Sequence, residues 1–182
     1  MIITVFGASQ TRPGDNLYQE SLTLGKLLAE SGYSVATCGY IGTMEAVSRG
    51  AAEAGGHVIG VTCSEIETWR TAGANQWVQE EQKLPTLIQR LDALIQQCDA
   101  ALALPGGVGT LAEILVMWNR LIINSISPRP LIIIGSGWKE ILSCFLEQQN
   151  NYISTKDRLW IQFADTAPQA VELLRNLLEE QG

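Results

Sequence analysis

The chain has 182 residues, of which 46% are hydrophobic and 17% charged, and its formal net charge at pH 7 is −7. This length and composition predict one domain, residues 1–182, with a core that needs no disulfide or structural metal. The acidic balance and the lack of clustered Lys and Arg argue against a surface built to bind nucleic acid.

Apolar runs that form strands alternate with amphipathic segments along the whole chain. Continuous apolar runs are typical of strands buried on both faces. We predict strands at 2–6, 34–38, 57–62, 100–104, 130–135 and, with a weaker pattern, 158–163. We predict helices at about 16–31, 42–55, 85–97, 109–124, 137–149 and 166–180, the last capped by Asp165 and Thr166. Regular alternation of this kind predicts an α/β fold, a three-layer doubly wound (Rossmann-like) sandwich with a parallel sheet.

Segment 64–84 departs from this alternation and carries Trp69 and Trp77 among mixed charges. Its composition is compatible with a flap over a site and equally with an oligomer contact. The helix at 109–124 is apolar on more than one face, as a helix buried against a partner or inside one subunit would be.

The remaining features point to an ordinary intracellular protein. The N-terminus reads as a strand without a signal-peptide pattern, and no apolar run has membrane-spanning length, so we expect a cytoplasmic protein with no membrane partner. Cys38, Cys63, Cys98 and Cys144 form no CxxC pair and are expected to be buried free thiols. The single histidine, His57, is expected at the start of a strand and argues against a histidine-based zinc site or a Ser-His-Asp triad.

Ligands of a doubly wound sheet bind at the loops that follow the carboxyl ends of the strands. Three such loops, at 7–10, 39–43 and 105–110, are rich in Gly, Ser or Thr and are expected to converge on one site. In the third loop, glycines allow backbone N–H groups to turn toward an anion at the start of a helix, where phosphate is the commonest occupant. No GxxxxGK[ST] occurs, and no GxGxxG follows the first strand, so a mononucleotide or sugar phosphate is favoured over ATP–Mg²⁺ or NAD.

Glu113 stands three residues after Thr110, in the predicted first turn of that helix. This spacing fits a capping box in which the carboxylate serves the helix end. It fits equally well a carboxylate that takes part in ligand chemistry, and spacing does not separate the two interpretations.

Residues 105–113, Pro-Gly-Gly-Val-Gly-Thr-Leu-Ala-Glu, resemble the PGGxGTxxE motif of the LOG (Lonely guy) family, cytokinin-activating phosphoribohydrolases long misannotated as lysine decarboxylases. Residues 5–9 are similar to the family's first strand and loop, and residues 39–47 and 54–61 to its GGxxGxMxAV…AGGxVIGV block. The molybdenum-cofactor carrier proteins, a related branch with the same fold, bind a phosphorylated pterin without hydrolysing it.

The resemblance implies hydrolysis of the N-glycosidic bond of a purine nucleoside 5′-monophosphate, AMP or an N6-modified analogue, to free base and ribose 5-phosphate. It implies Arg90 and Glu113 as catalytic residues, since a carboxylate can stabilise an oxocarbenium-like sugar and order the attacking water. A small-molecule nucleotide ligand, a homodimer or higher homo-oligomer, and no metal or organic cofactor are expected. The expected nucleotide-binding residues are Gly7, Ala8, Ser9, Gly39, Gly42, Met44, Gly106, Gly107, Val108, Gly109 and Thr110.

An alternative is a non-catalytic carrier or sensor of a phosphorylated ligand, such as molybdenum cofactor or a signalling nucleotide. It needs the glycine-rich anion site but neither catalytic residue, so the presence of Arg90 and Glu113 favours the enzyme. Leu91 and Ala112 stand where plant-type members have a lysine and an acidic residue, and they favour the carrier. The chain's lysines lie in no pyridoxal phosphate motif, which argues against a decarboxylase.

Overall fold

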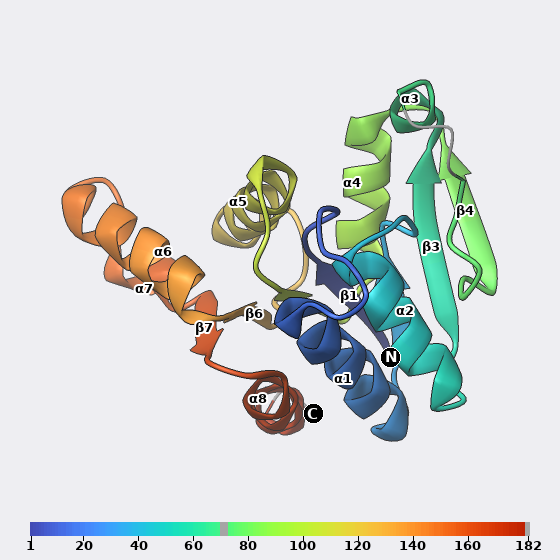
Figure 1. Cartoon of the computed structure of the whole chain (residues 1–182). Coiled ribbons are helices and arrows are strands. Elements are labelled where there is room, and N and C mark those ends of the chain that lie inside the picture. The colour runs from blue at the N-terminus through green and yellow to red at the C-terminus, as the bar shows by residue number, and fades with distance from the viewer. Residues whose placement is uncertain (70–72, 181–182) are drawn as a thin grey trace.

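Seven parallel strands form one sheet in the computed structural model, which describes residues 1–69 and 73–180 (Figure 1). The strands are β1 (Ile2–Phe6), β2 (Ser34–Thr37), β3 (Val58–Cys63), β4 (Glu80–Leu84), β5 (Ala100–Ala103), β6 (Leu131–Ile134) and β7 (Ile161–Ala164). Their order across the sheet is β4-β3-β2-β1-β5-β6-β7, and every neighbouring pair is parallel. The predicted Rossmann-like α/β fold is confirmed.

Helices cover both faces of the sheet, so the central strands are buried on both sides (Figure 1). The helices are α1 (Asn16–Glu30), α2 (Thr43–Glu53), α3 (Ser64–Glu67), α4 (Leu87–Gln96), α5 (Val108–Ile122), α6 (Ser136–Gln148), α7 (Thr155–Arg158) and α8 (Ala167–Glu179). Within β5, Ala101 and Ala103 join the core under α4 and α5, whereas Ala100 and Leu102 join the core under α1, α2 and α8. This alternation follows from the two-residue period of a strand and explains the continuous apolar runs in the sequence.

The sheet has a topological switch point between β1 and β5. The chain runs outward from β1 to β4, returns through α4 to β5 on the other side of β1, and then continues outward to β7. The helices that follow β1 and β5 therefore lie on opposite faces of the sheet, and their connecting loops diverge (Figure 1). Divergence of this kind opens a crevice at the carboxyl ends of the strands.

Two elements differ from the sequence prediction. Glu80–Leu84 forms an edge strand inside segment 64–84; its mostly exposed, charged side chains gave no apolar pattern, and such charges discourage edge-to-edge pairing. The weak strand predicted at 158–163 begins only at Ile161, because Ser154 caps the short helix Thr155–Arg158 in front of it. Residues 70–72 of segment 64–84 lie outside the described residues.

Three of the four cysteines are buried, as predicted, but Cys144 is exposed. The α6 helix buries Trp138 and Leu142, and Cys144 comes two residues after Leu142, which places it on the opposite side of the helix. His57 stands one residue before β3, and Thr166 caps α8 by accepting the Gln169 N–H, both close to expectation. Across the described residues, no helix combines the length and the apolar character needed to cross a bilayer.

Candidate active site

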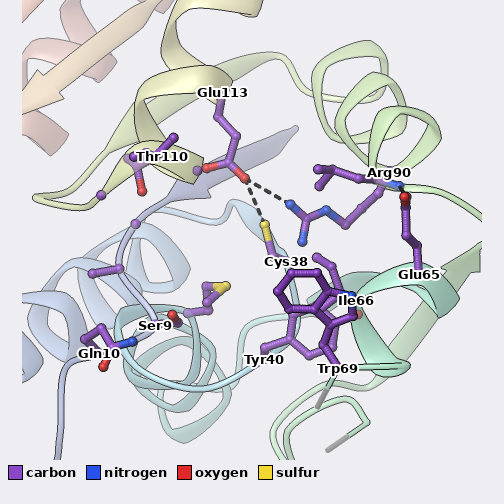
Figure 2. Close-up of a pocket in the computed structure, with 17 residues that line it drawn as sticks. Ser9, Gln10, Cys38, Tyr40, Glu65, Ile66, Trp69, Arg90, Thr110 and Glu113 are labelled. Carbon is purple, nitrogen blue, oxygen red and sulfur yellow. Dashed lines mark hydrogen bonds and ion pairs between the residues drawn. The ribbon is translucent and has the colours of Figure 1, made fainter.

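A cavity of about 540 Å³ opens at the switch point, beyond the carboxyl ends of β1, β2 and β5 (Figure 2). It is walled by the loop after β1, the start of α5, one side of α4 and the short helix α3. Ten of the residues predicted to bind or act on the ligand line it: Gly7, Ala8, Ser9, Met44, Arg90, Gly107, Val108, Gly109, Thr110 and Glu113. All three predicted loops thus contribute to one cavity, the second of them through Tyr40.

Three predicted ligand residues, Gly39, Gly42 and Gly106, do not line this cavity. Gly42 adopts φ +79°, and a Cβ there would lie 2.4 Å from the Ala8 carbonyl oxygen. The same carbonyl accepts hydrogen bonds from the backbone N–H and the hydroxyl of Thr43 at 2.9 and 3.0 Å. Gly42 therefore allows α2 to hold the first loop in place.

Gly39 and Gly106 also serve the surroundings of the cavity. Gly39 adopts φ +75° and donates its N–H to the Thr37 hydroxyl at 3.0 Å. Gly106 packs against the Thr110 side chain, where an added Cβ would lie 2.2 Å from the hydroxyl oxygen. Gly106 lines a neighbouring cavity of about 380 Å³, which Trp138 and Asp165 also line.

The N-terminus of α5 has the properties of an anion site. The helix begins at Val108, and no side chain caps it at Gly107. The N–H groups of its first turn therefore lack intrahelical partners, and the helix dipole adds positive potential there. A Cβ placed on Gly107 or Gly109 would meet nothing within 4 Å, so the backbone of this turn is open to the cavity. Together these features favour a phosphate at this position.

Glu113 points into the cavity and does not form a capping box. The helix starts earlier than predicted, so Glu113 lies in its second turn, and the first turn contains no acidic residue. The Glu113 side chain is buried, and its Oε1 accepts hydrogen bonds from the Cys38 thiol at 3.2 Å and from Arg90 Nη2 at 3.4 Å (Figure 2). The capping-box interpretation of its spacing is therefore wrong, and the carboxylate of Glu113 is available to a ligand.

Arg90 reaches the cavity from α4, whose start is capped by the Thr86 hydroxyl. Its side chain is only 7% exposed and meets Glu113 in a single long contact. Burial opposes its charge, but the neighbouring carboxylate of Glu113 favours it, and the pKa of the guanidinium is raised. Its Nε has no hydrogen-bond partner among the described residues. A buried cation with an unused donor is incomplete without a ligand.

Burial raises the pKa of Glu113 from 4.5 to about 7, although Arg90 and the Cys38 hydrogen bond work in the opposite direction. The carboxyl group thus changes charge near neutral pH. Perturbed carboxyl groups in clefts are common at catalytic sites, because a pKa near the working pH suits proton transfer.

The sequence reasoning missed several cavity residues, most of them aromatic or apolar. Cys38, Glu65, Ile66, Trp69 and Leu87 were not predicted as site residues, and Gln10 and Tyr40 lie in predicted loops but were not singled out. The Tyr40 hydroxyl is fixed by both backbone groups of Cys63, at 2.8 and 3.1 Å, so its ring forms a firm wall. Trp69, which is 90% exposed, lines the cavity together with Glu65 and Ile66, so part of segment 64–84 belongs to the site. The irregular, aromatic composition of that segment was the available signal.

Comparisons with known proteins agree with this geometry. The family model described as possible lysine decarboxylase matches residues 44–174. The cytokinin riboside 5′-monophosphate phosphoribohydrolase LOG4 of Arabidopsis thaliana is 34% identical over 78% of this chain, which covers 64% of that enzyme. Its relative LOG7 from the same plant is 30% identical over 97% of this chain and 81% of its own.

Solved structures establish the same fold. The molybdenum cofactor binding protein of Rippkaea orientalis superposes with a TM-score of 0.75 at 23% identity, covering 97% of this chain and 96% of that protein. At this identity the likeness concerns the fold, and the choice between enzyme and carrier depends on the cavity itself.

Proposed function

This chain belongs to the LOG family, whose model carries the description possible lysine decarboxylase, and we propose that it is a phosphoribohydrolase acting on purine nucleoside 5′-monophosphates. AMP or an N6-substituted analogue is hydrolysed to the free base and ribose 5-phosphate. The observation that carries the proposal is the buried Arg90–Glu113 pair beside the uncapped N-terminus of α5, both on the wall of one cavity.

The polar and apolar residues of the cavity are arranged to suit the phosphate, the sugar and the base of a nucleotide. Figure 2 shows Thr110, Ser9 and Gln10 on one side, Trp69 and Ile66 on the other, and Glu113 between them. The first side offers backbone amides for a phosphate. The second offers apolar and aromatic surface on which a flat base packs. Glu113 then lies beside the sugar that joins the two.

The reaction follows from this placement. Water adds its hydroxyl group to C1′ of the ribose, the C1′–N bond breaks, and the departing base retains the bonding electrons and takes up the proton that water releases. Glu113 Oε2, which makes no hydrogen bond with a described residue, orders the attacking water and stabilises positive charge on the sugar. Arg90, whose Nε has no hydrogen-bond partner among the described residues, donates to oxygens of the ligand and holds the ligand in position.

The cavity does not suit amino-acid decarboxylation by pyridoxal phosphate. That chemistry needs a lysine that forms a Schiff base with the cofactor. None of the described residues that line the cavity is a lysine. The family description therefore does not extend to the chemistry of this site.

The test is incubation of the purified protein with AMP and with N6-substituted AMP, with base and ribose 5-phosphate measured by chromatography. The proposal expects equal amounts of both products. Calorimetry of AMP binding to the wild-type protein, measured beside base release, separates the alternatives. If the wild-type protein binds AMP and releases no base, it is a carrier or sensor of phosphorylated ligands.

We also propose that the protein forms a homodimer or higher homo-oligomer through α5. Leu115 and Val116 in the middle of that helix are 39% and 38% exposed, and Ile123 just beyond its end is 63% exposed, so the helix is not fully buried inside one subunit. Apolar side chains clustered on one surface favour burial against a partner. Sedimentation of the wild-type protein and of a Val116→Glu variant tests this, and a wild-type monomer would contradict it.

A further inference from the structure

We propose that Cys38 is a positioning residue for Glu113: its thiol holds Oε1 in place, together with Arg90, and leaves Oε2 to face the ligand. The inference rests on the proposed function for its catalytic meaning, but the hydrogen bond itself can be tested without turnover. Nothing in the sequence distinguishes Cys38 from the other buried cysteines, since it ends an apolar run.

The fold delivers the thiol to the carboxylate. Cys38 directly follows β2, and the positive φ of Gly39 turns the chain immediately after it. The Cys38 side chain is buried on the cavity wall, with its Sγ 3.2 Å from Glu113 Oε1. Figure 2 shows both contacts to Glu113 converging on the same carboxylate oxygen.

The thiol acts as a donor here. Burial and the neighbouring negative charge of Glu113 raise the pKa of Cys38 well above its ordinary value, so the sulfur keeps its proton. A carboxylate oxygen can only accept, which fixes the direction of the bond. Cys38 is therefore unsuited to act as a nucleophile and suited to hold its neighbour.

The carboxylate needs this second donor because its ion pair is loose. Arg90 meets Oε1 at 3.4 Å, and its Nε is left without a partner among the described residues although the side chain is buried. Arg90 therefore retains donors for a ligand, and without Cys38 it would be the single group fixing the carboxylate. Among the described residues that line the cavity, the remaining charged group is Glu65, whose carboxylate accepts from the Leu87 N–H at 2.7 Å. The titratable hydroxyl of Tyr40 is engaged with the backbone of Cys63.

A mere packing role for Cys38 predicts different behaviour from a donor role. The hydrogen bond from Cys38 lowers the pKa of Glu113, so its loss moves the titration of Glu113 to higher pH. The ionised carboxylate is the active form in the proposed reaction. Loss of the bond therefore reduces kcat/KM most at low pH, whereas a change in packing alone reduces it equally at every pH.

The experiment compares Cys38→Ala, Cys38→Ser and the matched control Cys98→Ala. Cys98 is also buried, but its thiol donates to the Ile95 carbonyl outside the cavity. The titration of the Glu113 carboxyl carbon is followed by ¹³C NMR, assigned with Glu113→Gln. The acid limb of kcat/KM for AMP is measured in parallel.

We expect Cys38→Ala to move both midpoints upward and to lower kcat/KM about 3- to 10-fold at pH 6, with a change of less than about twofold at pH 8.5. Serine, which keeps a donor, restores both midpoints, and Cys98→Ala moves neither. An unchanged NMR midpoint in Cys38→Ala, or one that serine fails to restore, overturns the proposal. If AMP is not hydrolysed, the proposed function fails, while the NMR titration still decides the hydrogen bond.

A measurement on the wild-type protein covers the case in which the variants do not fold. The S–H stretching band of a thiol moves when its acceptor changes charge. In the vibrational spectrum of the wild-type protein, the S–H stretching band of one cysteine should therefore shift as Glu113 titrates near pH 7. If no thiol band moves across that range, Cys38 does not hold Glu113.

Discussion

Two arginine–carboxylate pairs join α4 to α5, and they differ in almost every physical respect. Arg120 and Asp92 meet on the surface in a short contact, with side chains 18% and 58% exposed. Arg90 and Glu113 meet inside the cavity in a longer contact, with side chains 7% and 6% exposed. The shorter ion pair is thus the more exposed one, which water and salt weaken.

The difference shows that the buried pair is not there to stabilise the fold. Taking two charges out of water costs free energy that a single long contact does not recover. The raised pKa of Glu113, about 7, is the sign of that cost. In the proposed function this pair serves a ligand at the open N-terminus of α5, so activity should respond to the buried pair far more than to the exposed one.

The largest expected effect is on catalysis by Glu113. Glu113→Gln removes the negative charge that stabilises the sugar while keeping the side chain's shape, and we expect kcat for AMP to fall about 10³-fold or more. Glu147→Gln, an exposed carboxylate of α6 away from the cavity, is the control and should leave kcat unchanged. Turnover by Glu113→Gln within tenfold of the wild type would contradict this role.

Arg90→Ala should lower kcat/KM for AMP about 10²-fold, because the ligand loses a charged donor and Glu113 loses the cation that favours its ionised form. Arg49→Ala is the control, since Arg49 lies outside the cavity and its half-exposed side chain is paired with Glu53 on α2. Steady-state kinetics of both variants measure the contrast. Equal losses in the two variants would mean that burial of the arginine is irrelevant.

Stability should change in the opposite direction to activity. The pKa of Glu113 in the folded protein lies above its ordinary value of 4.5, so its favourable contribution is present below pH 4.5 and is lost as pH rises through about 7. Glutamine cannot ionise. Glu113→Gln should therefore be more stable than the wild type at pH 8, by up to about 3 kcal/mol, and similar to it near pH 4.5. Urea unfolding at both pH values measures this, and a variant less stable at pH 8 would refute it.

A smaller and gradual effect is expected in the pH dependence of kcat/KM for the wild-type protein. Since the ionised carboxylate is the active form, kcat/KM for AMP should rise with pH and level off above about 7. Below that midpoint it should fall about tenfold for each pH unit. A flat profile from pH 5 to 8 would show that Glu113 does not act through its charge.

The smallest effect is expected at the exposed pair. Arg120→Ala should change the free energy of unfolding by less than about 1 kcal/mol, the usual value of a surface ion pair, and should leave AMP turnover unchanged. Thermal unfolding and kinetics on one preparation provide the check. A loss of activity here would remove the distinction between the two pairs.

The sequence was sufficient for the fold because the central strands are apolar on both faces, as in 2–6 and 130–135. It was insufficient for β4, whose charged side chains suit an exposed sheet edge and carry no apolar period. It also assigned Glu113 to the first turn of α5, whereas the helix starts one residue earlier than predicted and Glu113 lies in the second turn, because helix boundaries depend on backbone geometry that the motif does not specify.

For the site, the motif and its neighbours were enough to select Arg90, Glu113 and the loop at 107–110, which the structure brings to one cavity. Cys38 could not be selected, because its place at the cavity depends on how β2 lies in the folded chain, whereas Trp69 was marked only by the irregular composition of segment 64–84. Gly42 shows the converse case. It looked like a ligand residue and instead supports the first loop from behind.

The most direct test of the account is the rate at which the wild-type protein releases adenine from AMP compared with adenosine, at pH 8 and equal concentration. The uncapped N-terminus of α5 can bind the phosphate of AMP, and adenosine has no such group. We predict release from AMP with a kcat/KM at least about 10²-fold above that for adenosine. Equal rates for the two, or no release from AMP, would contradict a phosphate site joined to a catalytic carboxylate.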